Sequence, residues 1–167
     1  MLNSIHTIVF DFDGVFTDNF VYTDSNGIEQ VKTSRSDSFG LSNFREFCSN
    51  NSLNIEMFIL STEANSVVSQ RAQKLGLNCH TGVSNKKDFL SKYLANQNLQ
   101  SQLGLVFLGN DLNDLECLEM AEFSFCPSDA HETVKKVVTH PLNCQGGNGF
   151  VRQALEFLQS NTLIKGY

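Results

Sequence analysis

Two aspartates two positions apart are the first residues of this sequence that could do chemistry. Asp11 and Asp13 follow an apolar, β-branched run over residues 5–10. Where a chain is extended, side chains two apart point the same way, so the two carboxylates would lie side by side and repel each other. A hard divalent cation relieves that repulsion, because it prefers oxygen ligands. The pair therefore predicts a site for a metal such as Mg2+.

The surrounding elements predict where this pair lies. The 5–10 run is apolar on both faces, which is typical of a central parallel strand. Further short apolar runs, each separated from the next by a predicted helix, occupy residues 55–60, 77–81, 103–108 and 123–126. Five strands alternating with helices favour an α/β fold. Such sheets place ligands beyond the carboxyl ends of their strands, which is where Asp11 and Asp13 stand.

The stretch after the acid pair predicts a β-hairpin. Two β-prone runs, 19–23 and 28–33, flank a turn that ends in Asn26-Gly27, and Asn-Gly is a strong hairpin signal. Only a small flap could close over the site from here. The alternative is an ordinary hairpin with no gating role.

Length and composition limit the number of domains and the classes of partner that this chain can have. A chain of 167 residues fits one domain spanning 1–167. A formal net charge of -6 without a Lys/Arg cluster argues against nucleic acid as a partner. Five cysteines, with no C-x-x-C pair, are typical of a reduced, cytoplasmic protein. The first residues lack signal-peptide features and the apolar runs are short, so we expect no membrane association.

Four motifs in order carry a resemblance to a known family. The string D-F-D-G-V-F-T-D from Asp11 to Asp18 resembles the first motif of the haloacid dehalogenase (HAD) superfamily phosphatases. Ser61, at the end of the 55–60 strand, matches the second motif, and Lys86, at the start of a predicted helix, matches the third. Lys87 is the rival for that role. The stretch G-N-D-L-N-D over 109–114 resembles the fourth motif.

The resemblance implies a division of roles. Asp11 would be the nucleophile that takes the phosphoryl group, and Asp13 the general acid and base. Ser61 would hold the phosphoryl oxygens, and Lys86 would neutralise charge on the nucleophile and the phosphoryl group. A cation at a helix start opposes the helix dipole, which a nearby phosphate would justify.

The fourth motif departs from the family pattern. Asn110 stands where the family usually has a metal-binding Asp. An Asn oxygen can still bind Mg2+, but one negative charge is lost, and metal affinity should fall. Asp111 is adjacent and could substitute. The expected Mg2+ ligands are therefore Asp11, the main-chain oxygen of Asp13, and either Asn110 or Asp111.

Within the superfamily, the chain resembles the capless sugar-acid phosphatases that act on 3-deoxy-manno-octulosonate 8-phosphate or 2-keto-3-deoxynononate 9-phosphate. This implies a HAD-like Rossmannoid parallel sheet flanked by helices, a small hairpin flap, no cap domain, and a homotetramer in which a neighbouring subunit completes the site. The substrate contacts it implies are Thr17, Arg35, Ser36, Asp37, Ser38, Thr62, Glu63, Arg71, Asp114 and Arg152.

Some of these residues have a simpler interpretation. Ser36 or Asp37 could be the N-cap of a helix starting near Asp37 or Ser38. Arg35 and Arg71 could be surface charges. Arg152 ends a Gly-rich stretch that resembles the C-terminal signature of these phosphatases.

The residue type at position 63 indicates which sugar acid is the substrate. The eight-carbon enzymes tend to have Arg there, and relatives acting on nine-carbon acids tend to have Glu. We therefore expect Mg2+-dependent hydrolysis of a nine-carbon, sialic-type 9-phosphate through an aspartyl-phosphate, with the eight-carbon 8-phosphate as runner-up. The alternative is a weakly active or non-catalytic oligomerisation module, similar to the C-terminal domain of acylneuraminate cytidylyltransferases, which also has Gly-Asn in motif four. A mutase or nucleotidyltransferase is a third option.

Overall fold

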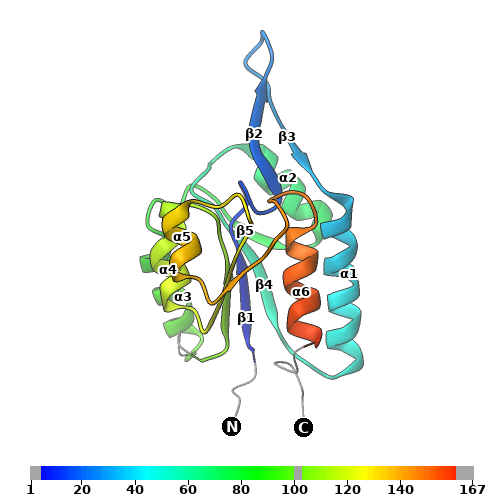
Figure 1. Ribbon diagram of the computed structural model, residues 1–167, viewed down its shortest axis with the longest axis vertical. Helices are drawn as coiled ribbons and strands as arrows, with labels where there is room; N and C mark the ends of the chain where they lie inside the picture. The colour runs from blue at the N-terminus through cyan, green and yellow to red at the C-terminus, as the bar shows by residue number, and fades with distance from the viewer. Residues whose placement is uncertain (1–4, 100–102, 161–167) are drawn as a thin grey trace.

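The computed structural model describes residues 5–99 and 103–160. A six-stranded parallel sheet has the order β5-β4-β1-β6-β7-β8, and a separate hairpin, β2-β3, projects beyond it (Figure 1). The sheet strands are β1 (Thr7–Phe10), β4 (Glu56–Leu60), β5 (Asn78–His80), β6 (Leu105–Leu108), β7 (Phe123–Cys126) and β8 (His140–Pro141). The helices are α1 (Arg35–Asn50), α2 (Ser66–Leu75), α3 (Lys86–Asn96), α4 (Leu115–Met120), α5 (Glu132–Val137) and α6 (Phe150–Ser160), with a 3-10 helix η1 at Leu112–Asp114.

Strand β1 lies at the centre because it is apolar on both faces. All four of its residues are buried, and it pairs in parallel with β4 and β6. Phe10 is in register with Ile59 of β4 and Leu108 of β6. The residues that follow these three strands therefore emerge side by side at one edge of the sheet.

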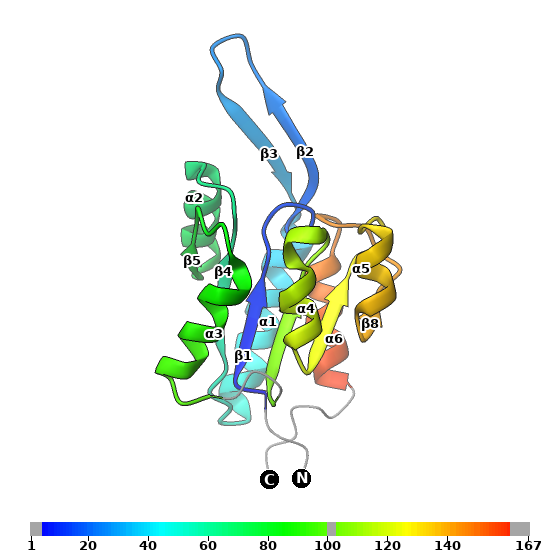
Figure 2. The same ribbon diagram turned by 90° about the vertical axis from the view of Figure 1, so that its left-hand side faces the viewer.

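Helices cover both faces of the sheet (Figures 1 and 2). On one face α1, α2 and α6 bury apolar residues such as Leu41, Val68 and Leu155 in one core cluster. On the other, α3, α4 and α5 contribute Leu90, Leu118 and others to a second cluster. The predicted fold class is confirmed, because a parallel sheet lies between two helical layers.

The start of α1 differs from the prediction. Ser34 is the N-cap, its hydroxyl accepting from the Ser36 amide at 3.1 Å, so the helix begins at Arg35, and Ser36 and Asp37 lie within its first turn. The predicted N-cap at Ser36 or Asp37 is wrong, because Ser34, two or three residues earlier, already satisfies a free amide of the first turn. The predicted Gly C-cap of α2 is confirmed: Gly76 is left-handed, with a φ of 63°.

The sixth strand, β8, was not predicted. It has two residues, of which His140 pairs with Phe125 and Pro141 with Cys126. So short a segment shows no alternation, and Pro argues against a strand except at a sheet edge, which is where β8 lies.

The hairpin extends away from the sheet (Figure 2). Strands β2 (Thr17–Thr23) and β3 (Glu29–Thr33) are antiparallel, as predicted. It carries four exposed apolar side chains, namely Phe20 (67%), Val21 (54%), Tyr22 (57%) and Ile28 (57%). In the described part of the chain, no helix is long and apolar enough to cross a membrane.

Candidate active site

A buried lysine joins the first and fourth motifs. Lys86 Nζ lies 2.7 Å from Asp11 Oδ1 and 2.7 Å from Asp114 Oδ1, and all three residues are buried. Asn85 caps α3 by accepting from the Asp88 amide, so Lys86 is the first residue of that helix. The neighbouring Lys87 instead pairs with Glu116 at the surface.

The site holds two carboxylates around one cation. Burial, and then repulsion from Asp114, raises the pKa of Asp11 to about 8, although Lys86 opposes this. Burial would lower the pKa of Lys86, but attraction to Asp11 and Asp114 outweighs it and raises that pKa. A further positive charge beside Asp11 would therefore favour its ionised, nucleophilic form.

Three oxygens can converge on a metal beside Asp11. One terminal atom of the Asn110 amide lies 2.8 Å from the main-chain oxygen of Asp13 and 3.3 Å from Asp11 Oδ2. Octahedral Mg2+ binds oxygen at about 2.1 Å, which sets neighbouring ligands roughly 3 Å apart. With the amide oxygen in that position, its distances to the Asp13 carbonyl and to Asp11 are those expected of neighbouring ligands of one Mg2+ ion. Asp111 is exposed, and its carboxylate instead caps η1 by accepting from the Leu112 amide at 2.7 Å.

Asp13 borders a small acidic cavity of about 30 Å3. Its lining is Phe12, Asp13, Val21, Glu29, Val31, Glu63, Asn65, Val67 and Val68. Burial, followed by repulsion from Glu63 and, to a smaller extent, Glu29, raises the pKa of Asp13, against the opposing effect of Lys86. A raised pKa suits a carboxyl group that must donate a proton.

Ser61 stands beside Asp11 at the end of β4. It is buried, and its Oγ accepts from the Glu63 amide at 3.0 Å, while its hydroxyl has one proton to donate. Thr62 is exposed and accepts from Asn113 Nδ2 at 3.4 Å. Thr17 Oγ1 accepts from the Gly14 amide at 3.1 Å, which fixes the loop that carries Asp13.

The remaining predicted substrate residues gather near the start of α1. Arg35, Ser38 and Arg71 line a cavity of about 550 Å3 together with Thr33, Phe39 and Ser42. Arg71 Nη2 donates to Ser38 Oγ at 2.7 Å. This cavity has no lining residue in common with the one beside Asp13.

Two more predicted contacts have structural partners. Asp37 is buried and accepts from the Arg152 amide at 3.0 Å, so it binds the first turn of α6. The Arg152 side chain pairs with Glu156 and lies over the Phe39 ring. Ser36 is exposed on α1.

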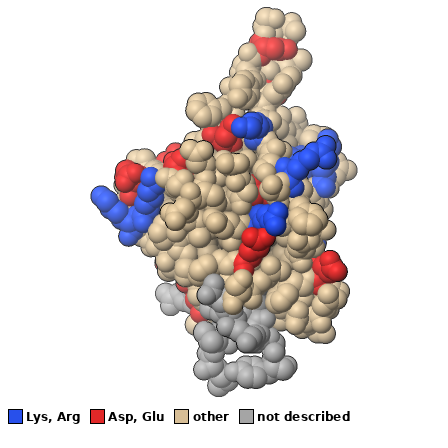
Figure 3. Space-filling view, turned by 45° about the vertical axis from the view of Figure 1, so that its right-hand side comes forward, with Lys and Arg blue, Asp and Glu red and all other residues tan. Residues whose placement is uncertain are grey.

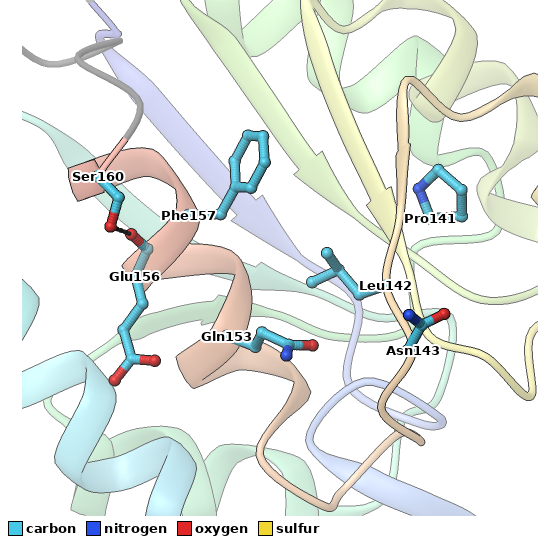
Figure 4. Close-up of a pocket in the computed structure, with 7 residues that line it drawn as sticks. All are labelled: Pro141, Leu142, Asn143, Gln153, Glu156, Phe157 and Ser160. Carbon is cyan, nitrogen blue, oxygen red and sulfur yellow. Dashed lines mark hydrogen bonds between the residues drawn. The ribbon is translucent and has the colours of Figure 1, made fainter.

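The other surfaces described are less suitable as a phosphate-binding site. Figure 3 shows acidic and basic side chains scattered over the face in view, with no continuous basic band. A hollow of about 350 Å3 lies between α6 and the segment after β8, where Leu142 and Phe157 face each other (Figure 4). Its lining residues include no Lys, Arg or His to bind a phosphate.

Three roles were not evident in the sequence. Asp114 was predicted as a substrate contact, whereas the structure places it as the second partner of Lys86. Glu29 and Asn65 were not singled out, yet both line the cavity beside Asp13, and Asn65 Nδ2 donates to Glu29 Oε2. Nothing in the local pattern indicates that the hairpin meets α2 there.

The fold and this site define a haloacid dehalogenase-like hydrolase. The model of that family matches residues 3–153, and the chain belongs to it. The predictions of the family and of an enzyme are therefore confirmed. A crystal structure from Streptomyces avermitilis, assigned to the HAD family hydrolases, is 31% identical in sequence to this chain. The two structures superpose with a TM-score of 0.86 over 96% of this chain and 88% of that one.

Relatives of known activity are more distant. The chain is 28% identical to the 3-deoxy-D-manno-octulosonate 8-phosphate phosphatase KdsC of Salmonella typhi over 156 residues, which are 93% of this chain and 79% of the relative. The enzyme of the same name from Escherichia coli K12 is 27% identical over the same share. The Moraxella catarrhalis phosphatase, solved with magnesium, phosphate and KDO, has a TM-score of 0.86 at 23% identity, covering 98% and 91% of the two chains.

Proposed function

We propose that this protein is a Mg2+-dependent phosphatase of a phosphorylated keto-deoxy sugar acid. The observation that carries the proposal is the group of Asp11, Lys86 and Asn110. The buried Asp11 carboxylate has one oxygen 2.7 Å from the lysine and the other beside two further potential metal ligands, Asn110 and the Asp13 carbonyl. The similarity to the KdsC phosphatases over 93% of the chain supports the substrate class, and the magnesium in the Moraxella relative supports the cofactor.

The reaction would take place in two displacements. An Asp11 oxygen attacks phosphorus, the ester P–O bond breaks, and Asp13 gives its proton to the leaving sugar oxygen. Asp13 then takes a proton from a water molecule, whose oxygen attacks the aspartyl-phosphate. Inorganic phosphate leaves, and the Asp11 carboxylate is restored.

The other residues stabilise charge on the transferring group. Lys86 and the Ser61 hydroxyl would act on the phosphoryl oxygens from the ends of neighbouring elements. Asp114 holds Lys86 in place from the opposite side. Bound Mg2+, held by Asp11, the Asp13 carbonyl and Asn110, would supply the positive charge that two carboxylates around one lysine lack.

The nine-carbon sugar acid is the favoured substrate, and the eight-carbon acid is the second choice. Glu63 supports this order, because relatives acting on nine-carbon acids tend to have Glu at this position, and it lies in the cavity beside Asp13. Glu29, Glu63 and Asp13 make this cavity acidic, which favours hydroxyl groups near the ester and repels the carboxylate of the substrate. That carboxylate therefore belongs at the far end of the molecule.

A homotetramer would complete the site. The four exposed apolar side chains on the hairpin are the kind of surface that pairs with another subunit. The cavity of Arg35, Ser38 and Arg71 shares no lining residue with the Asp13 cavity, although a third cavity has Thr33 and Arg71 in common with the first and Val31 and Val67 in common with the second. In the assembly, the guanidinium groups of Arg35 and Arg71 would receive the carboxylate of a substrate held by a neighbour.

The test is phosphate release with Mg2+ from nine-carbon and eight-carbon ulosonate phosphates, hexose phosphates and an aryl phosphate. We expect selective release from one sugar acid, and loss of at least about a thousandfold in kcat for Asp11→Asn. Asp88→Asn removes an exposed carboxylate outside the four motifs, one that pairs with the exposed Lys92; it is the control and should retain turnover.

Each result has a distinct meaning. Full turnover by Asp11→Asn would exclude it as the nucleophile. Preference for the eight-carbon ester would reverse the substrate order but keep the phosphatase. No release from any ester by a folded oligomer would favour the non-catalytic oligomerisation module.

A further inference from the structure

We propose that the side-chain amide of Asn110 reverses when the metal binds. In the metal-free protein its nitrogen faces Asp11 and Asp13, and in the metal-bound protein its oxygen takes that place. The inference concerns Mg2+ binding alone and does not depend on which phosphate ester is the substrate.

The hydrogen-bonding partners of the amide motivate the proposal. The atom that lies 2.8 Å from the Asp13 carbonyl oxygen and 3.3 Å from Asp11 Oδ2 faces only acceptors. If that atom is the nitrogen, it donates to both oxygens. If it is the oxygen and Asp11 is ionised, three acceptors face one another, which is favourable only with a cation among them. Each orientation therefore matches one state of the site.

The backbone of Asn110 is held while its side chain can turn. Its amide donates to Asp114 Oδ2 at 2.9 Å, and its carbonyl accepts from the His131 amide at 2.8 Å. These two bonds fix the main chain from both sides. Rotation about χ2 of an asparagine is soft, and the two orientations have nearly the same shape. The reversal therefore requires no movement of η1 or β6.

Gly14 has no side chain, which leaves the space in which the side-chain amide of Asn110 packs. A Cβ at this glycine would lie 2.0 Å from Asn110 Nδ2 when the amide oxygen faces the metal position, and Gly14 also has a φ of 76°. The amide thus lies directly against the Gly14 α-carbon. In the reversed orientation, the oxygen and not the NH2 group touches it, which gives the two states different proton contacts.

An aspartate in this position could not act in the same way. Ionised, it would place a third acceptor against Asp11 and the Asp13 carbonyl, so the metal-free site would be repulsive. The Asn110 amide instead satisfies both oxygens, and Mg2+ must displace those hydrogen bonds. The asparagine therefore favours the metal-free fold and weakens Mg2+ binding, on the order of tenfold or more.

The direct test is proton NMR of the 15N-labelled full chain, with the Asn110 side-chain amide assigned by its loss in Asn110→Asp. With saturating MgCl2, we expect strong NOEs from the Asn110 NH2 protons to the Gly14 α protons. After EDTA treatment these NOEs should weaken severalfold, because the NH2 group then faces Asp11 and Asp13. Equal NOE intensities in both states would overturn the proposal, whatever the activity.

A binding measurement tests the energetic consequence. Asn110→Asp should lower the Kd for Mg2+ at least about tenfold by calorimetry, and should also lower the Tm of the metal-free protein. Asn113→Asp adds the same charge at an exposed position of η1 and is the matched control, expected to change both values little. An unchanged metal-free Tm for Asn110→Asp would contradict the stabilising hydrogen bonds on which the proposal rests.

Discussion

At the scale of single residues, Lys86 decides the electrostatics of the site. It is a buried cation that two carboxylates, Asp11 and Asp114, contact at the same distance of 2.7 Å. A buried charge that loses its partner is strongly unfavourable, and here one lysine neutralises two acids. The same residue therefore stabilises the fold and prepares the proposed nucleophile.

Replacing Lys86 tests both roles. Lys86→Met should abolish phosphatase activity and lower the free energy of unfolding by about 3 kcal/mol, since two buried carboxylates lose their cation. Chemical denaturation and phosphate release measure the two effects. Lys87→Met is the matched control, because Lys87 is half exposed and pairs with an exposed Glu116, and it should leave stability nearly unchanged. Similar effects of the two substitutions would refute this account of Lys86.

At the scale of elements, the site is made by strand ends. Strands β4, β1 and β6 are in register, so Ser61, Asp11 and Asn110 reach one edge of the sheet although they are far apart in sequence. The helix that starts at Lys86 brings the fourth group. The sheet thus converts four separate motifs into one constellation, in keeping with the position of ligand sites in open α/β sheets.

The edge strand β8 gives a pH-dependent prediction. His140 packs against the rings of Phe125 and Phe157, and burial lowers its pKa. The unfolded chain therefore binds the proton more readily than the folded one. Stability from the neutral ring is present above about pH 6.5, the ordinary histidine pKa, and is lost as the pH falls toward the lower folded value.

The prediction is measured by thermal unfolding of the wild type and His140→Phe at pH 7.5 and 5.5. Phenylalanine keeps the ring packing without a titratable group, so the variant should lose less Tm than the wild type over this interval. A drop of equal size in both proteins would mean that His140 does not contribute to acid sensitivity.

At the scale of the whole molecule, the hairpin is the feature on which the proposed tetramer depends. It projects beyond the sheet (Figure 1) with Phe20, Val21, Tyr22 and Ile28 exposed. Such a concentration of apolar side chains on one arm is typical of a subunit interface. The assembly would cover this surface and bring the Arg71 cavity of one subunit toward the substrate of another.

Polar substitutions on the hairpin test this assembly. The double variant Phe20→Ser, Tyr22→Ser should reduce the mass measured by light scattering from that of a tetramer to that of a smaller species. Activity on the sugar acid should fall more than activity on an aryl phosphate, which has no carboxylate to place. Leu103→Ser removes an exposed apolar side chain outside the hairpin and should leave the mass unchanged. A wild-type monomer with full activity would contradict the proposal.

The fold class and the candidates for the reacting groups followed from the sequence by itself. A buried strand has a continuous apolar pattern, and the order of four short motifs is visible without coordinates, so the parallel sheet, Asp11 and Lys86 could all be predicted. The hairpin was predictable because Asn-Gly strongly favours a tight turn. Prediction failed where local signals were weak, as at β8, or where two candidates competed, as at the start of α1.

Tertiary structure alone decided which side chains meet. Lys86, and not Lys87, contacts Asp11, and Asn110, and not the exposed Asp111, lies beside Asp11 and Asp13. These contacts depend on distances to β1, a strand far away in the chain, which no local pattern encodes. For the same reason the contacts of Asp37 with the start of α6 and of Asp114 with Lys86 could not be predicted, whereas their predicted roles as substrate contacts remain predictions. The groups that can react are identified from the sequence, because a residue's type and its neighbours in the chain are visible there. Their partners depend on packing across the sheet, which brings together residues that are distant in the sequence.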